Sequence, residues 1–329
     1  MVGLAAYGCY FPAARLTAAE TERVWGSPIA DLDSKPVAAA DEDALTLAAA
    51  AAATIDGDAA LGSMSLASTT LPYRRRVQIG VLARALRSGG DSLFTTEHTT
   101  SARAGTEALA VQLLAVRASG RSGMVVAADV ASPTGDAHRA AVLGAGAVAL
   151  LVAEDGAVAT FEASAHHVAE DPGLDFVPAG ESALQDVQVS GYTQEALGAA
   201  VRGAVEPLLH RLGRTPSDYR FLVLGTMPGR LLDAAARGCG FTREQSRPVW
   251  AFPSTGDLGA AGALTNLALA LDTAEPGDRI LLVGYGAGSG ADALSFTAGE
   301  SAGRGTVARA LAGGRPVDAL TYLRMTGRI

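Results

Sequence analysis

Short apolar runs alternate with alanine- and leucine-rich segments along most of this chain. Glycine and aspartate bound the apolar runs, so the pattern predicts strands that alternate with helices, which is typical of the α/β class. Two runs, Met124–Ala128 and Ile280–Val283, are continuously apolar, as strands buried on both faces are, and we expect a layered parallel core. The predicted strands are Val2–Tyr7, Ser63–Thr69, Gly123–Ala128, Ala145–Val152, Tyr219–Leu224, Arg279–Val283 and Ala293–Thr297.

One arrangement occurs twice. The segments that start at Gly105 and at Gly262 both begin with small residues, continue as an Ala/Leu-rich helix, turn at a glycine and end in an apolar strand. Such a match indicates an internal duplication. Both helices are apolar on nearly every side, so we expect them to lie buried between two sheets, in a five-layer arrangement. The small residues at their starts permit a close approach of backbone or ligand; they are Ala102, Ala104, Gly105, Gly259, Ala260 and Gly262.

Composition excludes several classes of protein. The 329 residues are 49% hydrophobic and 18% charged, which excludes disorder. A net charge of −8 argues against a nucleic-acid partner. Two distant cysteines, Cys9 and Cys239, make neither a disulfide framework nor a zinc site. No segment resembles a signal peptide, and the longest apolar run, from Ala44 to Ile55, is too short to span a membrane, so we expect a cytoplasmic protein.

The order of these motifs resembles the thiolase superfamily, on the branch of 3-hydroxy-3-methylglutaryl-CoA synthase and β-ketoacyl-ACP synthase III. GLAAYGCYFPAARL is similar to that branch's first strand, DEDALTLAAAAA to its first helix and LASTTLPY to the next strand. GAGAVALLVAEDG and the closing YLRMTGRI resemble later landmarks. The long block TGDLGAAGALTNLALALDTAEPGDRILLVGYGAGSGADAL is the most specific stretch of the resemblance.

The resemblance implies a thiolase-like αβαβα sandwich with two pseudo-symmetric halves, residues 1–165 and 166–329. It implies a dimer that binds acyl-CoA or acyl-carrier-protein thioesters through a tunnel. A nucleophilic cysteine at the start of the first central helix attacks the thioester, since a helix N-terminus lowers the pKa of a thiol. A histidine with an asparagine, or a glutamate with a histidine, handles protons and the enolate. No resident cofactor is implied, because the CoA or carrier-protein thioester is the substrate or ligand.

This sequence departs from the family pattern at each of those positions. The cysteine position, four residues before the Thr of SARAGT, holds Ala102. The family histidine falls at Thr226 or Met227, and the asparagine at Ser254. The synthase glutamate falls at Thr69. Neither Cys9 nor Cys239 replaces the nucleophile, and both are interpreted as small buried residues.

Other residues near the vacated position are candidates for chemistry or binding. Ser101 could act as a nucleophile with His98 or Glu97 as base, although a serine at a helix start is commonly an N-cap. Arg103 either binds a carboxylate or phosphate, or pairs with a neighbouring residue. Asp257 is either a helix cap or an acid that faces the site.

Two further motifs can each be interpreted either as part of a binding site or as a structural element. The loop Arg74, Arg75 and Arg76 could bind the phosphates of CoA or the acidic face of a carrier protein, or form a solvated dimer rim. GYGAGSGAD lies between two predicted strands, so we interpret it as a turn whose glycines, including Gly286, line the site. The histidines show no ligand spacing, and the side chains of the adjacent pair His166 and His167 would diverge on a strand, so no metal site is expected.

The sequence therefore leaves two functions open. The first is a non-nucleophilic subunit of an acyl-CoA-dependent acyltransferase or condensing complex, in acyl-CoA or secondary metabolism. By resemblance, such a subunit is a homodimer or assembles with an active thiolase and a small zinc-ribbon/OB-fold protein. The second is an active acyltransferase or C–C condensing enzyme that uses Ser101 or direct acyl transfer from a CoA or carrier-protein thioester. A binder that recognises acyl-CoA without chemistry is a third hypothesis.

Overall fold

The computed structural model describes residues 1–55, 61–87, 92–187 and 189–327. Its strands form two sheets. The larger sheet has nine strands in the order β5-β4-β6-β7-β1-β8-β11-β10-β9, and the smaller has the order β12-β2-β3. The strands are β1 (Gly3–Tyr10), β2 (Ala14–Thr17), β3 (Ser34–Val37), β4 (Ser63–Ser68), β5 (Phe94–Thr99), β6 (Gly123–Asp129), β7 (Gly146–Ala153), β8 (Ala159–His167), β9 (Phe221–Val223), β10 (Arg279–Gly286), β11 (Gly290–Ala298) and β12 (Arg315–Val317).

Some helices begin at a capping residue whose side chain accepts hydrogen bonds from the first turn, as at α1, α2, α5 and α12. At the start of α2, for example, the Asp43 carboxylate accepts a hydrogen bond from the Thr46 amide, and the Thr46 hydroxyl accepts one from the Asp43 amide. The α-helices are α1 (Ala18–Trp25), α2 (Ala44–Ala52), α3 (Ile79–Ala85), α4 (Ala104–Ser119), α5 (Ala137–Val142), α6 (Ser190–Leu212), α7 (Gly229–Gly238), α8 (Arg243–Ser246), α9 (Phe252–Thr255), α10 (Gly262–Thr273), α11 (Thr306–Ala312) and α12 (Ala319–Met325), with 3₁₀ turns η1 (Pro216–Asp218), η2 (Arg247–Val249) and η3 (Gly259–Ala261).

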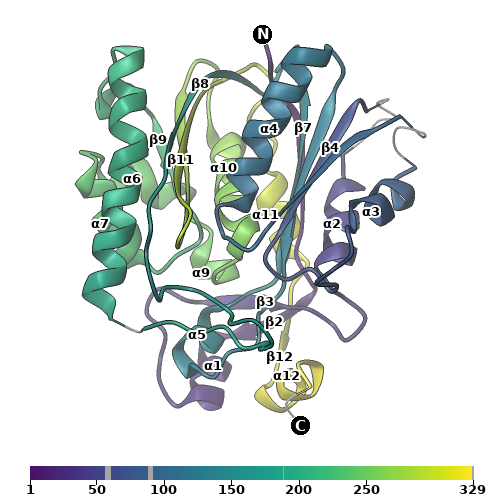
Figure 1. Cartoon of the computed structure of the whole chain (residues 1–329). Coiled ribbons are helices and arrows are strands. Elements are labelled where there is room, and N and C mark those ends of the chain that lie inside the picture. Colours follow the sequence, from purple (N-terminus) through teal and green to yellow (C-terminus); the bar gives the residue numbers. More distant parts are fainter. Residues whose placement is uncertain (56–60, 88–91, 188, 328–329) are drawn as a thin grey trace.

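The helices and the folded nine-stranded sheet form five layers (Figure 1). Helices α4 and α10 lie in the middle, with β4 and β6 against α4 and with β9 and β10 against α10. Helix α6 covers the outer face of β8 and β11, and α2 covers the outer face of β6 and β7. The predicted thiolase-like five-layer sandwich is confirmed.

All seven predicted strands are present, with bounds that shift by a few residues. The predicted parallel core is wrong, because β6 pairs with β7, β7 with β1, and β8 with β11 in antiparallel register. Parallel pairing is found between β4 and its two neighbours and between β9 and β10. A continuous apolar run shows that both faces of a strand are buried, and it does not fix the direction of the neighbouring strand. The predicted division between residues 165 and 166 falls inside β8, and it stays a prediction.

The two central helices differ in how completely they are buried. Helix α10 is buried along its first ten residues apart from Leu269, whereas α4 exposes Leu114, which is 65% accessible. The glycine-rich run after β10 is the tight turn between β10 and β11, as predicted. His166 and His167 end β8 on opposite faces, since His166 bonds Asp292 while His167 packs against Gly203 of α6.

The central helices meet at a glycine. A Cβ atom added at Gly105, in the first turn of α4, would lie 2.2 Å from the carbonyl oxygen of Ala260 in η3. That distance is far below van der Waals contact, and the neighbouring atom belongs to the backbone. The absent side chain therefore sets how closely α4 approaches the start of α10.

One buried carboxylate ties the same region together. Asp129 ends β6 and is 2% exposed. Its Oδ1 accepts hydrogen bonds from the hydroxyl groups of Ser68 and Thr70 and from the amides of Thr69 and Thr70, at 2.7–3.0 Å. Its Oδ2 accepts from the Thr69 hydroxyl at 3.0 Å and from the Ala260 amide at 2.7 Å. Burial raises the pKa of Asp129, and these donors act in the opposite direction.

Replacing Gly105→Ala should lower the free energy of unfolding by about 1–3 kcal/mol, because the new methyl group pushes α4 away from the Ala260 carbonyl. Gly80→Ala is the matched control, since Gly80 lies in helix α3 and a Cβ there meets open space. That change should stabilise the protein by up to about 1 kcal/mol. Urea unfolding measures the free energy of unfolding of both variants. A Gly105→Ala protein as stable as wild type would contradict this packing.

Replacing Asp129→Asn should lower the free energy of unfolding by about 2–3 kcal/mol, because an amide NH₂ cannot accept from a backbone amide. Asp136→Asn is the control. Its carboxylate accepts from the amides of His138 and Arg139 at the start of α5, and asparagine caps a helix about equally well. Equal losses in the two variants would show that the Asp129 cluster has no special role.

Candidate functional site

A cavity of about 130 Å³ lies beside the starts of the two central helices. The turn before α4, the segment after β9, the start of α10 and the end of β10 form most of its wall, and α5, α6 and the loop 168–187 close it. The lining residues are Ala102, Arg139, Leu174, Asp175, Asp186, Thr193, Leu197, Gly225, Thr226, Met227, Pro228, Leu231, Asp257, Gly259, Ala263, Tyr285, Gly286 and Ala287.

Six residues singled out from the sequence meet in this wall, namely Ala102, Thr226, Met227, Asp257, Gly259 and Gly286. Ala102 lies two residues before α4. Met227 follows β9, and its carbonyl oxygen accepts a hydrogen bond of 2.9 Å from the Trp250 indole. Residues far apart in the chain therefore converge on one space.

Two vacated positions lie elsewhere. Ser254 belongs to α9 and does not line the cavity. Thr69 uses its amide and hydroxyl to bind Asp129, and it is also absent from the lining. Thr226, the alternative histidine position, does line the cavity; it is 2% exposed and its hydroxyl accepts from the Leu258 amide at 2.8 Å.

Ser101 lies next to the cavity but is held by its neighbours. Its Oγ accepts a hydrogen bond of 3.2 Å from the Arg103 amide and packs so closely on Gly286 that a side chain there would collide with it. His98 lies on β5, bonds the Thr96 hydroxyl at 3.1 Å, and burial lowers its pKa. In the described parts of the chain, no hydrogen bond joins His98 to Ser101.

Glu97, the other suggested base, accepts hydrogen bonds from the amides of Gln78 and Ile79 at the start of α3. Its carboxylate thus accepts hydrogen bonds at the start of α3, and among the described residues no hydrogen bond joins it to Ser101.

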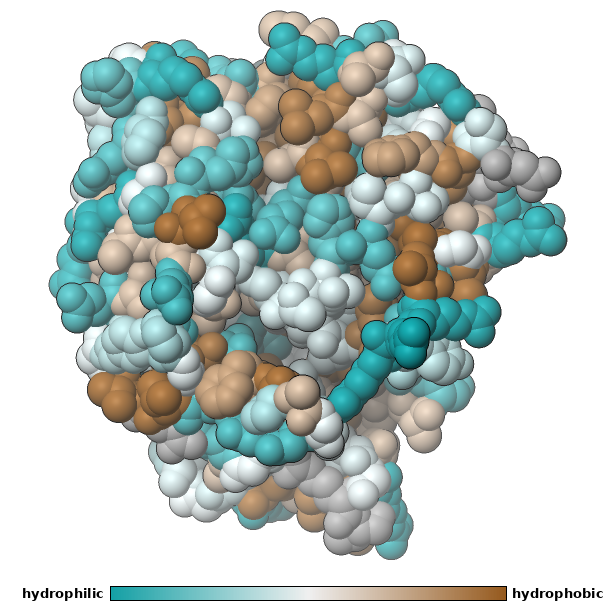
Figure 2. Space-filling view, viewed as in Figure 1, coloured by the Kyte–Doolittle hydropathy of each residue, from teal (hydrophilic) through white to brown (hydrophobic). Residues whose placement is uncertain are grey.

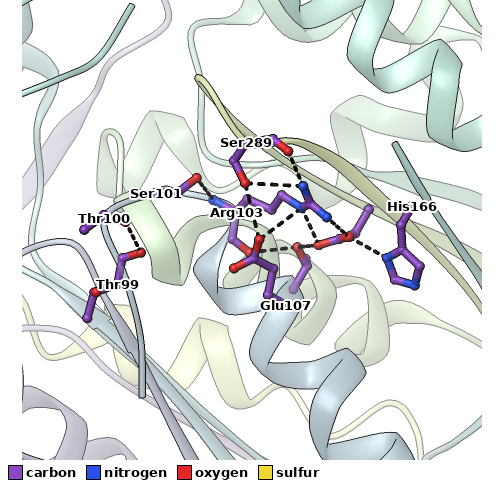
Figure 3. Close-up of polar contacts among 9 residues, drawn as sticks. Thr99, Thr100, Ser101, Arg103, Glu107, His166 and Ser289 are labelled. Atoms are coloured by element: carbon purple, nitrogen blue, oxygen red, sulfur yellow. Dashed lines mark hydrogen bonds and ion pairs between the residues drawn. The ribbon is translucent and has the colours of Figure 1, made fainter. Parts of the chain in front are cut away.

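Arg103 pairs with a neighbour from the second half of the sequence (Figure 3). Its Nε and Nη2 atoms donate to the two carboxylate oxygens of Asp292 at 3.0 and 2.8 Å, and it also donates to the Ser289 carbonyl. His166 reaches the same carboxylate, with 2.6 Å between Nδ1 and Oδ1. Asp292 is 1% exposed, so this is a buried bidentate ion pair that fixes the start of α4 against β11.

The loop Arg74–Arg76 is exposed and lies outside the cavity lining. The Arg74 guanidinium donates to the carbonyl oxygen of Glu181, and Arg76 lies over the Tyr73 ring at 5.9 Å. The arginine loop therefore contacts the loop 168–187, which itself closes the cavity.

Several wall residues were not predicted. Arg139 of α5 forms an ion pair with Asp175, and Tyr285 donates its hydroxyl to Asp171 at 3.1 Å. Burial, and then the nearby Asp171, raise the pKa of Tyr285. Burial also raises the pKa of Asp257, whose Oδ1 accepts from the Gly259 amide at 3.0 Å. Of these unpredicted residues, Tyr285 could have been identified from the sequence, because it lies at the end of a buried strand.

The two cysteines lie outside the cavity lining, and both are buried. Cys9 lies within β1, and Cys239 follows α7. Burial raises the pKa of both thiols, to about 11 for Cys239. Both thiols are therefore protonated and unreactive at neutral pH.

No group of histidine, cysteine, aspartate and glutamate among the described residues has a geometry that could hold a metal ion. No described helix combines the length and apolar character needed to cross a bilayer.

Comparisons with known proteins point to one family. Residues 209–297 match the model of the C-terminal region of 3-oxoacyl-[acyl-carrier-protein] synthase III. The hydroxymethylglutaryl-CoA synthase of Pyrobaculum arsenaticum is 32% identical over 310 residues, which cover 90% of this chain and 87% of that protein. That of Aeropyrum pernix is 31% identical over 309 residues, which cover 89% and 84%.

Solved structures share the fold. MvaS in complex with 3-hydroxy-3-methylglutaryl coenzyme A has a TM-score of 0.88 at 19% identity, covering 99% of this chain and 91% of that one. The HMG synthase of the curacin pathway, in complex with its holo donor acyl carrier protein, has a TM-score of 0.87 at 17% identity, covering 98% and 88%. With relatives above 30% identity along nine tenths of its length, this chain belongs to the hydroxymethylglutaryl-CoA synthase family of the thiolase superfamily.

Proposed function

We propose that this chain binds a CoA or acyl-carrier-protein thioester in the cavity beside α4 and forms no covalent acyl intermediate with it. The observation that carries this proposal is the position of Ala102. It lines the cavity directly before α4, where the family resemblance expects the nucleophilic cysteine. A methyl group cannot attack a thioester.

The remaining side chains support the same role. Met227, at the position aligned with the histidine, has no proton to exchange, and Thr69 and Ser254 lie outside the lining. Cys9 and Cys239 are buried elsewhere. The cavity thus keeps the space for a thioester without the groups for acyl transfer through a thiol.

In this proposal the chain is the non-nucleophilic subunit of an acyltransferase or condensing complex, as a homodimer or together with an active thiolase and a zinc-ribbon/OB-fold protein. The outer edge of β5 supports assembly, because it ends the large sheet and Phe94 on it is 57% exposed. The exposed loop Arg74–Arg76 supplies cations for CoA phosphates or for an acidic carrier protein.

The variant Ala102→Cys should gain a capacity for acylation that the wild type lacks. A thiol at that place would lie at the N-terminus of α4, which favours the thiolate. Incubation with acetyl-CoA followed by intact-mass spectrometry should show one added acetyl group on the variant and none on the wild type.

Ala287→Cys is the matched control, since Ala287 lines the same cavity from the β10–β11 turn. Its acylation should be at least about tenfold slower, because no helix begins there. Stoichiometric acylation of the wild type would contradict the proposal. Equal rates for the two cysteine variants would remove Ala102 as the position of the lost nucleophile.

The alternative is an active acyltransferase that uses Ser101 or direct transfer. The position of Ser101 one residue before Ala102 favours this alternative. Two observations argue against it: the Ser101 hydroxyl accepts a hydrogen bond from the Arg103 amide, and among the described residues no base is hydrogen-bonded to Ser101. We expect Ser101→Ala to leave thioester binding and any turnover of the purified chain within about twofold of wild type. Loss of turnover in Ser101→Ala, together with an acylated Ser101 peptide from the wild type, would establish the alternative.

A further inference from the structure

We propose that the cavity selects thioesters whose acyl group is an unsubstituted apolar chain of about four to six carbon atoms, with Leu197 and Ala263 as specificity-determining residues. This inference rests on the proposed thioester binding and adds the chemical class and the size of the acyl group.

Apolar side chains from separate segments gather around the cavity. The aliphatic lining residues larger than alanine are Leu174, Leu197, Met227, Pro228 and Leu231, and they come from the loop 168–187, from α6, from the segment after β9 and from α7. On the face of the molecule shown in Figure 2, by contrast, hydrophobic residues lie in small groups among hydrophilic ones. The cavity therefore concentrates aliphatic groups around one space.

A core cluster supports this aliphatic wall from behind. Leu197 is 2% exposed and belongs to the cluster, and Met227 and Leu231 pack against it. Helices α6 and α7, which carry Leu197 and Leu231, lie side by side (Figure 1). Because a close-packed core yields little, the wall has a fixed shape that limits the length of a bound chain.

The charged side chains of the lining already interact within the protein. Arg139 forms an ion pair with Asp175, and Asp186 has an interaction of its own. Asp257 accepts from the Gly259 amide at 3.0 Å, and burial disfavours the charged form of its carboxyl group. These groups therefore give a charged acyl group no preferred place.

The uncharged polar side chains of the lining are bonded as well. The Tyr285 hydroxyl donates to a buried aspartate at 3.1 Å, and that of Thr193 donates to the carbonyl oxygen at the N-cap of α6 at 3.3 Å. The Thr226 hydroxyl accepts from a backbone amide at 2.8 Å. A hydroxyl group on the acyl chain would have to compete with these bonds, whereas a methylene group would not.

The Nε atom of Arg139 is a buried donor for which the described residues supply no acceptor. An acceptor in the CoA part of the ligand would serve it equally in every thioester, so such a bond would not distinguish acyl groups. A bond from Nε to the acyl chain would instead favour a chain with a hydroxyl group, and the experiment below compares the two cases.

The size of the space limits the length of the chain. The cavity has a volume of about 130 Å³, and an apolar cavity of about 150 Å³ holds benzene. Each buried methylene group tightens binding by up to about fourfold. Affinity should therefore rise from an acetyl to a butyryl or hexanoyl group and fall once the chain is longer than the space.

A series of thioesters that share the CoA part tests both claims, by isothermal titration of the purified full-length chain. Butyryl-CoA should bind at least about fivefold more tightly than acetyl-CoA. Octanoyl-CoA should bind at least about threefold more weakly than the tighter of butyryl- and hexanoyl-CoA. 3-Hydroxybutyryl-CoA should bind at least about threefold more weakly than butyryl-CoA, because its hydroxyl group loses water without gaining a partner.

The variant Leu197→Ala should raise the ratio of octanoyl-CoA to butyryl-CoA affinity at least about threefold, because the shortened side chain leaves room for a longer acyl chain. Leu208→Ala is the matched control. Leu208 is also a buried leucine of α6, 0% exposed, but it lies outside the lining, so its loss should leave the ratio within about twofold of wild type.

The variant Ala263→Val should act in the opposite direction. Ala263 lines the cavity from α10 and is 4% exposed, so the larger side chain reduces the space. The ratio of hexanoyl-CoA to acetyl-CoA affinity should fall at least about threefold. This variant also tests the proposal if Leu197→Ala does not fold.

The outcomes separate this inference from the proposed function. Equal affinities along the series, a steady rise through octanoyl-CoA, or tighter binding of 3-hydroxybutyryl-CoA than of butyryl-CoA would overturn the inference and leave thioester binding intact. Unchanged ratios in both Leu197→Ala and Ala263→Val would overturn it too. If no thioester of the series bound, the proposed function would fail, and this inference with it.

Discussion

The buried carboxylate of Asp129 is the interaction on which the site depends. It joins the turn after β4, through Thr69 and Thr70, to the Ala260 amide at the start of the second central helix. Segments separated by more than a hundred residues are thus fixed by one side chain. Because the Gly105 backbone lies against the Ala260 carbonyl at the same place, the starts of α4 and α10 are held in contact, and the cavity forms beside them.

A second buried carboxylate fixes the other side of α4. Asp292 binds Arg103 through both oxygens and also accepts from Thr106, one turn further along the helix. Arg103 is therefore occupied by the protein itself, which explains how a guanidinium lies 8% exposed beside a binding cavity. The position of Ala102 follows from these two anchors rather than from contacts of its own methyl group.

The sequence predicted most of the fold and part of the site. The apolar runs and the repeated helix–strand unit identify the strands and the central helices, because burial leaves a local pattern. Strand β8 alternates apolar and polar residues up to His167, which is the pattern of a strand with one buried face, so it could have been predicted. The small sheet has strands of three or four residues, which are too short to leave a clear signal. Arg139 and Asp186 reach the wall from α5 and a long loop, and their approach depends on tertiary packing that local sequence does not encode.

The cavity has two electrostatic ends. The N-terminus of α4, a helix of 16 residues, places a partial positive charge beside Ala102. The opposite part of the wall is closer to neutral, because Arg139 pairs with Asp175 and burial disfavours the charged form of Asp257. In a thioester, the carbonyl oxygen carries a partial negative charge, whereas the acyl chain does not. This distribution of charge matches that of the cavity wall. The partial charge that would favour a thiolate at position 102 would therefore also attract the carbonyl oxygen of a thioester, so in the proposed binding mode the carbonyl points toward α4.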